Sequence, residues 1–185
     1  MSVATTTDPQ TSVRPLRRET FEALVEQGHF AGERVELLEG VLVQMPPMSD
    51  RHARAITLLT KWLVRGLGDD VEVGPQVPLA ASAFSEPEPD ISVTRVRTVG
   101  SGHPQTAELA IEVTPSTHPT DLEIKPVIYA AAGIPQYWVI DLAADRAVVH
   151  SDPGDDGYAQ IAAVHAPATL MFRGVSIDLA ELLRR

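Results

Sequence analysis

The chain has 185 residues, of which 44% are hydrophobic and 22% charged, as in a soluble globular protein with one domain large enough to bury a core. Its formal net charge of −10 argues against a nucleic-acid partner, because affinity for phosphates is largely electrostatic, although an acidic protein can still carry a local basic face. The sequence has no cysteine, which excludes disulfides and thiolate metal sites.

The sequence gives no sign of a membrane or export signal. It lacks a run of about eighteen apolar residues, so we expect no transmembrane helix and no membrane partner. The N-terminal residues lack a basic region followed by an apolar one, so we expect no signal peptide and a cytoplasmic location. Residues 1–15 are polar and rich in threonine, and we expect them to be disordered, which leaves residues 16–185 as a single domain.

The first predicted elements are a short helix and a β-hairpin. Thr20 is a typical N-cap for a helix that ends near Gly28. Apolar runs on both sides of Glu39 and Gly40 predict the hairpin, over residues 34–45.

A long helix is predicted next, from Ser49 to Gly66 or Gly68. At about 100° per residue, one of its faces gathers a histidine and four aliphatic residues, namely His52, Ile56, Leu59, Leu63 and Leu67. Another face gathers the basic residues Arg51, Arg54, Lys61 and Arg65. These basic residues form either an ordinary solvated face or a stripe that contacts the phosphates of a nucleic acid.

The second half of the chain predicts a sheet. Short apolar runs indicate strands at residues 71–77, 90–94, 107–113 and 136–141. A helix from Thr120 to Ala132 separates the last two strands, and Thr120 with Glu123 fits a capping box. Pro126 argues that the regular helix begins later or is kinked, because a proline inside a helix removes a backbone hydrogen bond.

The order of these elements predicts the fold class. The strand–helix–strand unit of residues 107–141 suggests a right-handed βαβ crossover between parallel strands. A late hairpin at residues 147–151 and 158–164 and a short final helix at residues 178–183 follow it. We therefore expect an α/β fold with a mixed sheet.

Two carboxylates and a lysine are the candidate functional residues. Asp90 stands at the start of one predicted strand, and Glu112 lies near the end of another among residues expected to be buried. A buried carboxylate is costly unless it is paired or binds a metal. Taken singly, Asp90 can be a turn residue and Glu112 the partner of an arginine. Lys125 can be a solvated helix residue that pairs with Asp121.

Taken together, these residues favour a site for a hard divalent cation. Mg²⁺ prefers oxygen ligands and keeps several waters, so two carboxylates and a substrate phosphate are sufficient. Such a cation lowers the pKa of a bound water, and a nearby lysine can orient that water or stabilise the developing negative charge. The sequence shows no HExxH zinc motif, no glycine-rich phosphate loop and no serine-nucleophile elbow.

Four segments of the chain carry a further pattern. They are Glu33–Gly40 with Met45 and Pro46, Glu86–Asp90, Glu112–Lys125 and Tyr129–Asp141. Each segment is weak evidence alone, but the four in this order, over roughly residues 16–180, resemble the Uma-two family of restriction endonucleases. The pair Asp90 and Glu112 is similar to the acidic pair of the wider PD-(D/E)XK nuclease superfamily.

The resemblance implies a restriction-endonuclease-like mixed sheet flanked by helices, with an N-terminal helix and β-hairpin. It implies that Asp90 and Glu112 bind Mg²⁺ or Mn²⁺ and that Lys125 is the catalytic lysine. The superfamily usually places its lysine two residues after the acid, where this chain has Thr114, so the lysine would come from the following helix instead. Glu36 matches an acidic residue before the hairpin glycine and is either a further metal ligand or a structural anion.

Two more residues are second-rank candidates. His52 matches a histidine near the start of the long helix and is either a satisfied core residue or an accessory to the site. Asp121 is either the i,i+4 partner of Lys125 or a further accessory residue.

The resemblance predicts a Mg²⁺-dependent endodeoxyribonuclease, a hydrolase that cleaves phosphodiester bonds in DNA. The alternative is a non-catalytic nucleic-acid or protein-interaction module that retains a nuclease fold. A third hypothesis is a metal hydrolase of small molecules, which would need a deep pocket. A homodimer would suit cleavage of both strands of a duplex, although no residue of the sequence indicates one.

Overall fold

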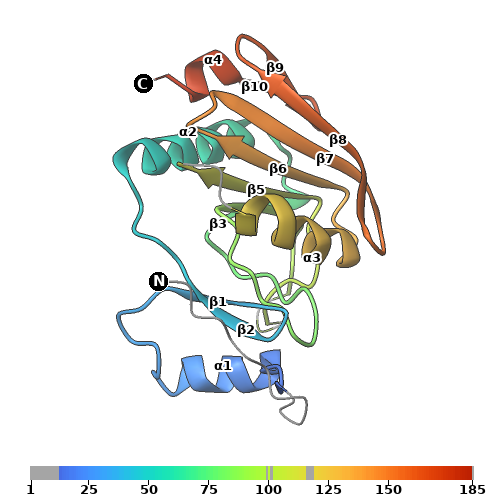
Figure 1. Ribbon diagram of the computed structural model, residues 1–185. Coiled ribbons are helices and arrows are strands. Elements are labelled where there is room, and N and C mark those ends of the chain that lie inside the picture. Colours follow the sequence, from blue (N-terminus) through green and yellow to red (C-terminus); the bar gives the residue numbers. More distant parts are fainter. Residues whose placement is uncertain (1–12, 99, 101, 116–118, 185) are drawn as a thin grey trace.

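The computed structural model describes residues 13–98, 100, 102–115 and 119–184. Its centre is a six-stranded sheet in the order β3-β4-β5-β6-β7-β8 (Figure 1). The strands are β3 (Val71–Pro75), β4 (Ile91–Arg95), β5 (Leu109–Thr114), β6 (Gln136–Asp141), β7 (Arg146–Gly154) and β8 (Gly157–His165). All neighbours in this sheet pair antiparallel except β5 and β6, which are parallel. The predicted mixed sheet and the parallel strand–helix–strand unit are therefore confirmed.

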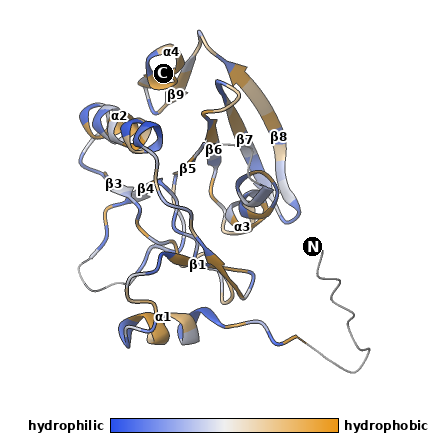
Figure 2. Ribbon diagram, turned by 60° about the vertical axis from the view of Figure 1, so that its left-hand side comes forward, coloured by the Kyte–Doolittle hydropathy of each residue, from blue (hydrophilic) through white to orange (hydrophobic). Residues whose placement is uncertain are grey.

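Helices cover both faces of the sheet (Figure 1). The helix α2 (Asp50–Gly66) packs on one face, in a core that it shares with β9 (Thr169–Phe172), β10 (Val175–Asp178) and α4 (Leu179–Leu182). As Figure 2 shows, its apolar stripe is turned toward the sheet and its polar face outward. The helix α3 (Lys125–Ala131) lies over the opposite face, in a second core.

The alternation of side chains along β5 decides which face receives the candidate acid. Leu109, Ile111 and Val113 belong to the core beneath α2, whereas Ala110 belongs to the core beneath α3. Because successive side chains of a strand point to opposite faces, Glu112 shares the face of Ala110. The carboxylate of Glu112 is therefore presented to α3.

A separate N-terminal layer contains α1 (Arg18–Glu26) and the hairpin of β1 (Val35–Leu38) and β2 (Val41–Gln44) (Figure 1). The hairpin turn is Glu39-Gly40, as predicted, and both residues have positive φ (51° and 81°), which suits the right-handed twist of the strands. A Cβ on Gly40 would stand 2.3 Å from that of Pro15, so only glycine fits here. A β-bridge between Leu37 and Glu86 joins this layer to the rest of the chain.

Two local predictions differ from the structure, and one element was missed. The helix α1 begins at Arg18 rather than after Thr20, because the amide of Thr20 already donates to the carbonyl of Arg17, 3.0 Å away. Thr120 forms no capping box: it lies inside a single π-helical turn, η1 (Thr120–Ile124), with no capping side chain before it. The hairpin of β9 and β10 was not predicted.

The other predicted elements are present with small shifts at their ends. The Ser49 hydroxyl caps α2 by accepting a hydrogen bond from the amide of His52. Regular α-helix begins at Lys125 with Pro126 in its first turn, as the proline predicted. The predicted disorder of residues 1–15 falls largely outside the described residues, and Leu16 is already tied to the hairpin through Gly40. None of the described helices is both long and apolar enough to span a membrane.

Candidate active site

The two predicted acids lie opposite one another on neighbouring strands. In the antiparallel pair of β4 and β5, Ile91 faces Ile111, and the same register carried one residue further sets Asp90 opposite Glu112. The Oδ2 atom of Asp90 accepts a hydrogen bond from the amide of Val113, 2.8 Å away. Asp90 and Glu112 are only 5% and 4% exposed, so both carboxylates are almost completely withdrawn from solvent.

Lys125 is the cation at the centre of this group. Its Nζ lies 2.9 Å from Oε1 of Glu112 and 3.0 Å from Oε2 of Glu36, and 3.8 Å from the carboxylate of Asp121. The lysine is itself buried, at 2% exposure. It is the first residue of α3, so the crossover between β5 and β6 carries it to the face toward which Glu112 points.

A tyrosine that the sequence did not single out completes the contacts of Glu112. The hydroxyl of Tyr129 donates to Oε1 of Glu112 at 3.0 Å. Tyr129 follows Lys125 by four residues on α3, so the two side chains share one face of the helix. That i,i+4 spacing was the available signal, and a buried aromatic residue is too common in cores for the spacing to be decisive.

The electrostatics of the group are dominated by an excess of negative charge. Burial raises the pKa of Glu112 well above its ordinary value; Lys125 opposes this shift, whereas Asp121, Asp90 and Glu36 add to it. Burial alone would lower the pKa of Lys125, but the attraction of Glu112, Glu36 and Asp121 outweighs it and raises that pKa. The ammonium therefore stays charged, and the buried carboxylates of Glu112 and Glu36 share this one positive charge.

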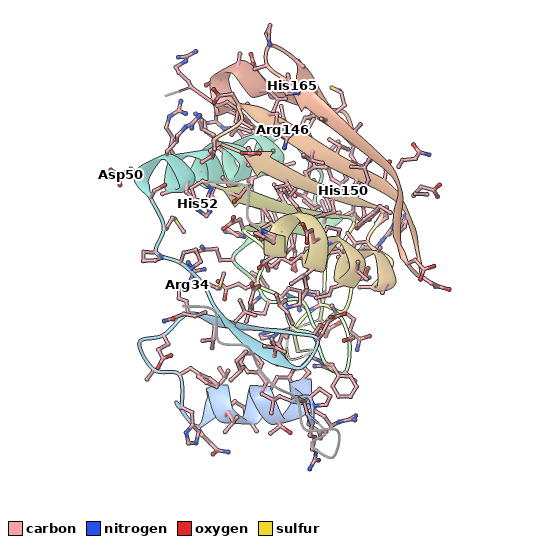
Figure 3. The ribbon with its side chains drawn as sticks, viewed as in Figure 1. Arg34, Asp50, His52, Arg146, His150 and His165 are labelled. Atoms are coloured by element: carbon pink, nitrogen blue, oxygen red, sulfur yellow. The ribbon has the colours of Figure 1, made fainter. Side chains whose placement is uncertain are left out.

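Glu36 and His52 reach the group from outside the central sheet. Glu36 belongs to β1 of the N-terminal layer, and its Oε2 also accepts the amide of Glu88 at 3.2 Å. His52 lies in the first turn of α2, with Nε2 2.9 Å from Oδ2 of Asp90 (Figure 3). Of the two interpretations of His52, the contact with Asp90 favours the accessory to the site, since its side chain also remains 16% exposed.

The basic stripe on α2 divides into two kinds of residue. Arg51 donates hydrogen bonds to the carbonyls of Leu142 and Leu183 and pairs with Asp145, so it anchors α2 to neighbouring segments. Arg54, Lys61 and Arg65 are exposed, and within the described part of the chain only Arg54 of these three forms a hydrogen bond, a long one of 3.4 Å to the carbonyl of Glu181. The contact of these four residues with a nucleic acid stays a prediction, and the guanidinium of Arg51 is already bonded to the protein.

The donor set suits a hard divalent cation. The contacts described above use Oδ2 of Asp90 and Oε1 of Glu112, which leaves Oδ1 and Oε2 as carboxylate oxygens for a metal. Two carboxylates with waters and a substrate phosphate match the preference of Mg²⁺ or Mn²⁺, and a dication supplies the missing positive charge. The residues therefore fit the metal that the sequence predicts.

The site residues line neither of two surface cavities in the described part of the chain. Two surface cavities, of about 350 and 620 Å³, are lined by residues elsewhere, such as Phe84 and Ile128 in the first and Arg97 and Phe172 in the second. A hydrolase of small molecules ordinarily encloses its substrate in a cavity beside the catalytic groups. The geometry thus gives no support to that third hypothesis.

Comparisons with known proteins bear on the fold and the family of the chain. A search of the curated proteins gives no match to the chain. A solved structure, described as a putative nuclease belonging to DUF820 from Anabaena variabilis, is similar with a TM-score of 0.68 over 80% of this chain and 89% of that one. At 15% sequence identity this likeness shows the fold alone. The model of the Uma2 (Uma-two) family, described as putative restriction endonuclease, matches residues 18–180. This chain therefore belongs to the Uma2 family, and that family points to a nuclease.

Proposed function

We propose that this protein is a metal-dependent endonuclease that hydrolyses phosphodiester bonds in DNA. The observation that carries the proposal is the meeting of Asp90, Glu112 and Lys125 in one buried group, although each comes from a different element. Burying two carboxylates and an ammonium carries a desolvation cost that pairing offsets only in part, and such groups cluster at functional sites. The Uma2 family supports hydrolysis of a nucleic acid as that use.

In this proposal, Asp90 and Glu112 hold Mg²⁺ or Mn²⁺ through Oδ1 and Oε2. The bound cation would lower the pKa of a water and stabilise negative charge on the phosphate. Tyr129 and Lys125 both bond to Oε1 of Glu112, so they fix the direction in which its other oxygen points. The amide of Val113 and the ring of His52 do the same for Asp90.

Lys125 would act as a fixed ammonium rather than as a base. Its raised pKa keeps it protonated at neutral pH, so it can stabilise the charge that develops on the phosphate oxygens but cannot accept a proton. Glu36, which comes from β1 rather than from the central sheet, also pairs with the lysine, which gives Glu36 a positioning role in addition to any contact with the metal. Exposed Arg54, Lys61 and Arg65 offer cations for the DNA backbone.

A plasmid assay tests the proposal. We expect the purified full chain to nick or linearise supercoiled DNA when Mg²⁺ or Mn²⁺ is present, and to stop when the metal is removed by a chelator. Parallel reactions with single-stranded DNA and with RNA test the choice of substrate. A wild-type chain that binds Mn²⁺ but cleaves none of the three substrates would favour the non-catalytic alternative, and oligomeric state measured under the same conditions tests the predicted homodimer.

As pH is lowered, the cleavage rate should fall at a higher pH than the ordinary pKa of a glutamate would predict. The pKa of Glu112 is raised, chiefly by burial, and its carboxylate must be deprotonated to hold a cation. Activity is therefore present above that raised pKa and lost as pH falls through it. Because metal and proton compete, a higher Mg²⁺ concentration should move the acid limb of the pH–rate profile to lower pH. An acid limb whose position does not change with Mg²⁺ concentration would contradict the assignment of Glu112 as a metal ligand.

A further inference from the structure

A second group of potential metal ligands lies apart from Asp90 and Glu112. Glu22 on α1, Glu86 before β4 and His103 before β5 each place a ligand atom within 4.8 Å of the others. Among the residues that the structure describes, no other trio of histidine, aspartate or glutamate side chains meets this condition. The three residues come from distant parts of the sequence, so their meeting is a product of the tertiary fold.

Glu86 is the unusual member of this group, because half of its carboxylate has no partner. The residue is only 3% exposed. Its Oε1 lies 2.6 Å from Nδ1 of His103, whereas Oε2 is buried and has no hydrogen-bond partner among the described residues. A buried carboxylate oxygen without a donor is destabilising, by about 1–3 kcal/mol or more for a charged group. A ligand that supplies positive charge would remove this cost.

The basic neighbours of Glu86 do not bond to its Oε2 atom among the described residues. Burial raises the pKa of Glu86, His103 opposes this shift, and the repulsion of Glu22 adds to it. Arg18, the nearby cation, pairs with Glu22 of the same cluster and donates to the carbonyl of Ser82. The cluster thus has one ion pair at Glu22 and one contact with an imidazole at Glu86, and Oε2 of Glu86 takes part in neither.

We propose that Glu22, Glu86 and His103 form a second cation site that takes a transition-metal dication of the Zn²⁺ class. An imidazole nitrogen with two carboxylates is a donor set typical of Zn²⁺, whereas Mg²⁺ and Ca²⁺ prefer oxygen alone. The site is independent of the proposed nuclease activity, since it shares no residue with the group around Lys125.

Binding of Zn²⁺ requires a rearrangement of the three side chains. Around a tetrahedral Zn²⁺ with bonds near 2.1 Å, neighbouring ligand atoms stand about 3.4 Å apart. The Glu86–His103 contact of 2.6 Å must therefore widen, and the side chain of His103 is free to move because it is 44% exposed. Its backbone is held in place nearby, since the carbonyl of Pro104 accepts the amide of Ala80 at 2.8 Å. Water can fill the remaining coordination position on the exposed side.

A bound cation would join α1 to two loops of the main domain. Glu86 also forms the β-bridge with Leu37, and Leu37 is the neighbour of Glu36 in β1. The cation would thus stabilise the position of β1, the strand whose Glu36 pairs with Lys125. We therefore expect a structural role, seen as a rise in thermal stability, rather than a catalytic one.

Calorimetric titration with Zn²⁺ alone, in a variant whose first site is disabled, tests the proposal. The full chain carrying Asp90→Asn and Glu112→Gln should bind one Zn²⁺ and, at hundredfold excess over Kd, gain about 5–10 °C in Tm. Adding His103→Ala or Glu86→Gln should weaken Zn²⁺ binding at least tenfold and abolish the Tm gain. Adding His29→Ala, which removes an exposed histidine of the same layer, should leave both unchanged.

The metal-free behaviour of Glu86→Gln separates a cation site from a simple ion pair with His103. If the carboxylates of Glu22 and Glu86 only repel each other in the metal-free protein, Glu86→Gln should leave the metal-free Tm unchanged or raise it. A large fall in metal-free Tm, with Zn²⁺ giving no gain in the parent variant, would overturn the proposal. Equal Zn²⁺ binding with and without His103 would also overturn it, by showing adventitious surface binding. His103→Ala on its own should keep Mg²⁺-dependent plasmid cleavage, so the two proposals can fail separately.

Discussion

Asp90→Asn and Glu112→Gln should each lower the rate of plasmid cleavage about a thousandfold, which corresponds to about 4 kcal/mol of transition-state stabilisation. Both changes keep the size of the side chain and its hydrogen-bond acceptor, but they remove the negative charge that holds the metal. Cleavage should be measured at saturating Mg²⁺ and at neutral pH, beside calorimetric titration with Mn²⁺. We expect Mn²⁺ affinity to fall together with the rate.

The control for these two variants is Asp155→Asn. Asp155 is an exposed acid in the turn between β7 and β8, away from the group around Lys125, and its replacement changes net charge by the same amount. Its cleavage rate should match that of the wild type. Folding of every variant is checked by thermal unfolding, because neutralising a buried carboxylate can also stabilise the metal-free protein. Retention of more than about a tenth of the activity in Asp90→Asn would contradict its assignment as a metal ligand.

Lys125→Met should destabilise the folded protein by about 3–5 kcal/mol in the absence of metal. Glu112 and Glu36 are bonded to the same ammonium at 2.9 and 3.0 Å, so its removal leaves two buried carboxylates without a counterion. Denaturant unfolding at neutral pH measures this loss. Because the pKa of Lys125 is raised, its stabilising charge is present at every pH below that value. Acidification should therefore reduce the difference in free energy of unfolding between wild type and Lys125→Met only by protonating the carboxylates.

A second substitution distinguishes lost charge from lost packing in this experiment. Glu112→Gln added to Lys125→Met should recover part of the stability, because it removes one of the two unpaired charges. Lys61→Met is the matched control: Lys61 is exposed on α2, and its replacement should change stability by less than about 0.5 kcal/mol. If the single and double variants are equally unstable, the ion cluster is not the cause, and Lys125 matters through packing alone.

The sequence predicted the main parts of the candidate site for physical reasons that the structure makes clear. Asp90 and Glu112 stood out because a charge next to a buried strand needs an explanation, and the structure places them opposite each other. Lys125 was assigned through the resemblance to the Uma-two family, because the position that usually holds the lysine is Thr114 in this chain. Tyr129 was missed because its hydroxyl matters only once its partner is known, and the sequence does not show which buried aromatic residue has a polar neighbour.

Other features depend on contacts that no local pattern encodes. Arg51 resembled its basic neighbours on the helix, and only the folded chain shows that two distant carbonyls accept its hydrogen bonds. The hairpin of β9 and β10 was missed, although its turn at Arg173 and Gly174 has positive φ at both residues, as the predicted turn at Glu39 and Gly40 does. The π-helical turn before Lys125 was not expected, although Pro126 correctly predicted a late start of the regular helix.

The parallel pairing of β5 and β6 explains how lysines at two different positions in the sequence can reach the same place in the structure. Parallel neighbours cannot be joined by a tight turn, so the chain must cross one face of the sheet between them. Glu112 points to the face that this crossing covers, and Thr114, two residues later, alternates to the same face. Thr114 on the strand and Lys125 on the crossing helix therefore both lie on the side of the sheet toward which Glu112 points. The topology fixes where a positive charge is needed and leaves open which segment of the chain provides it.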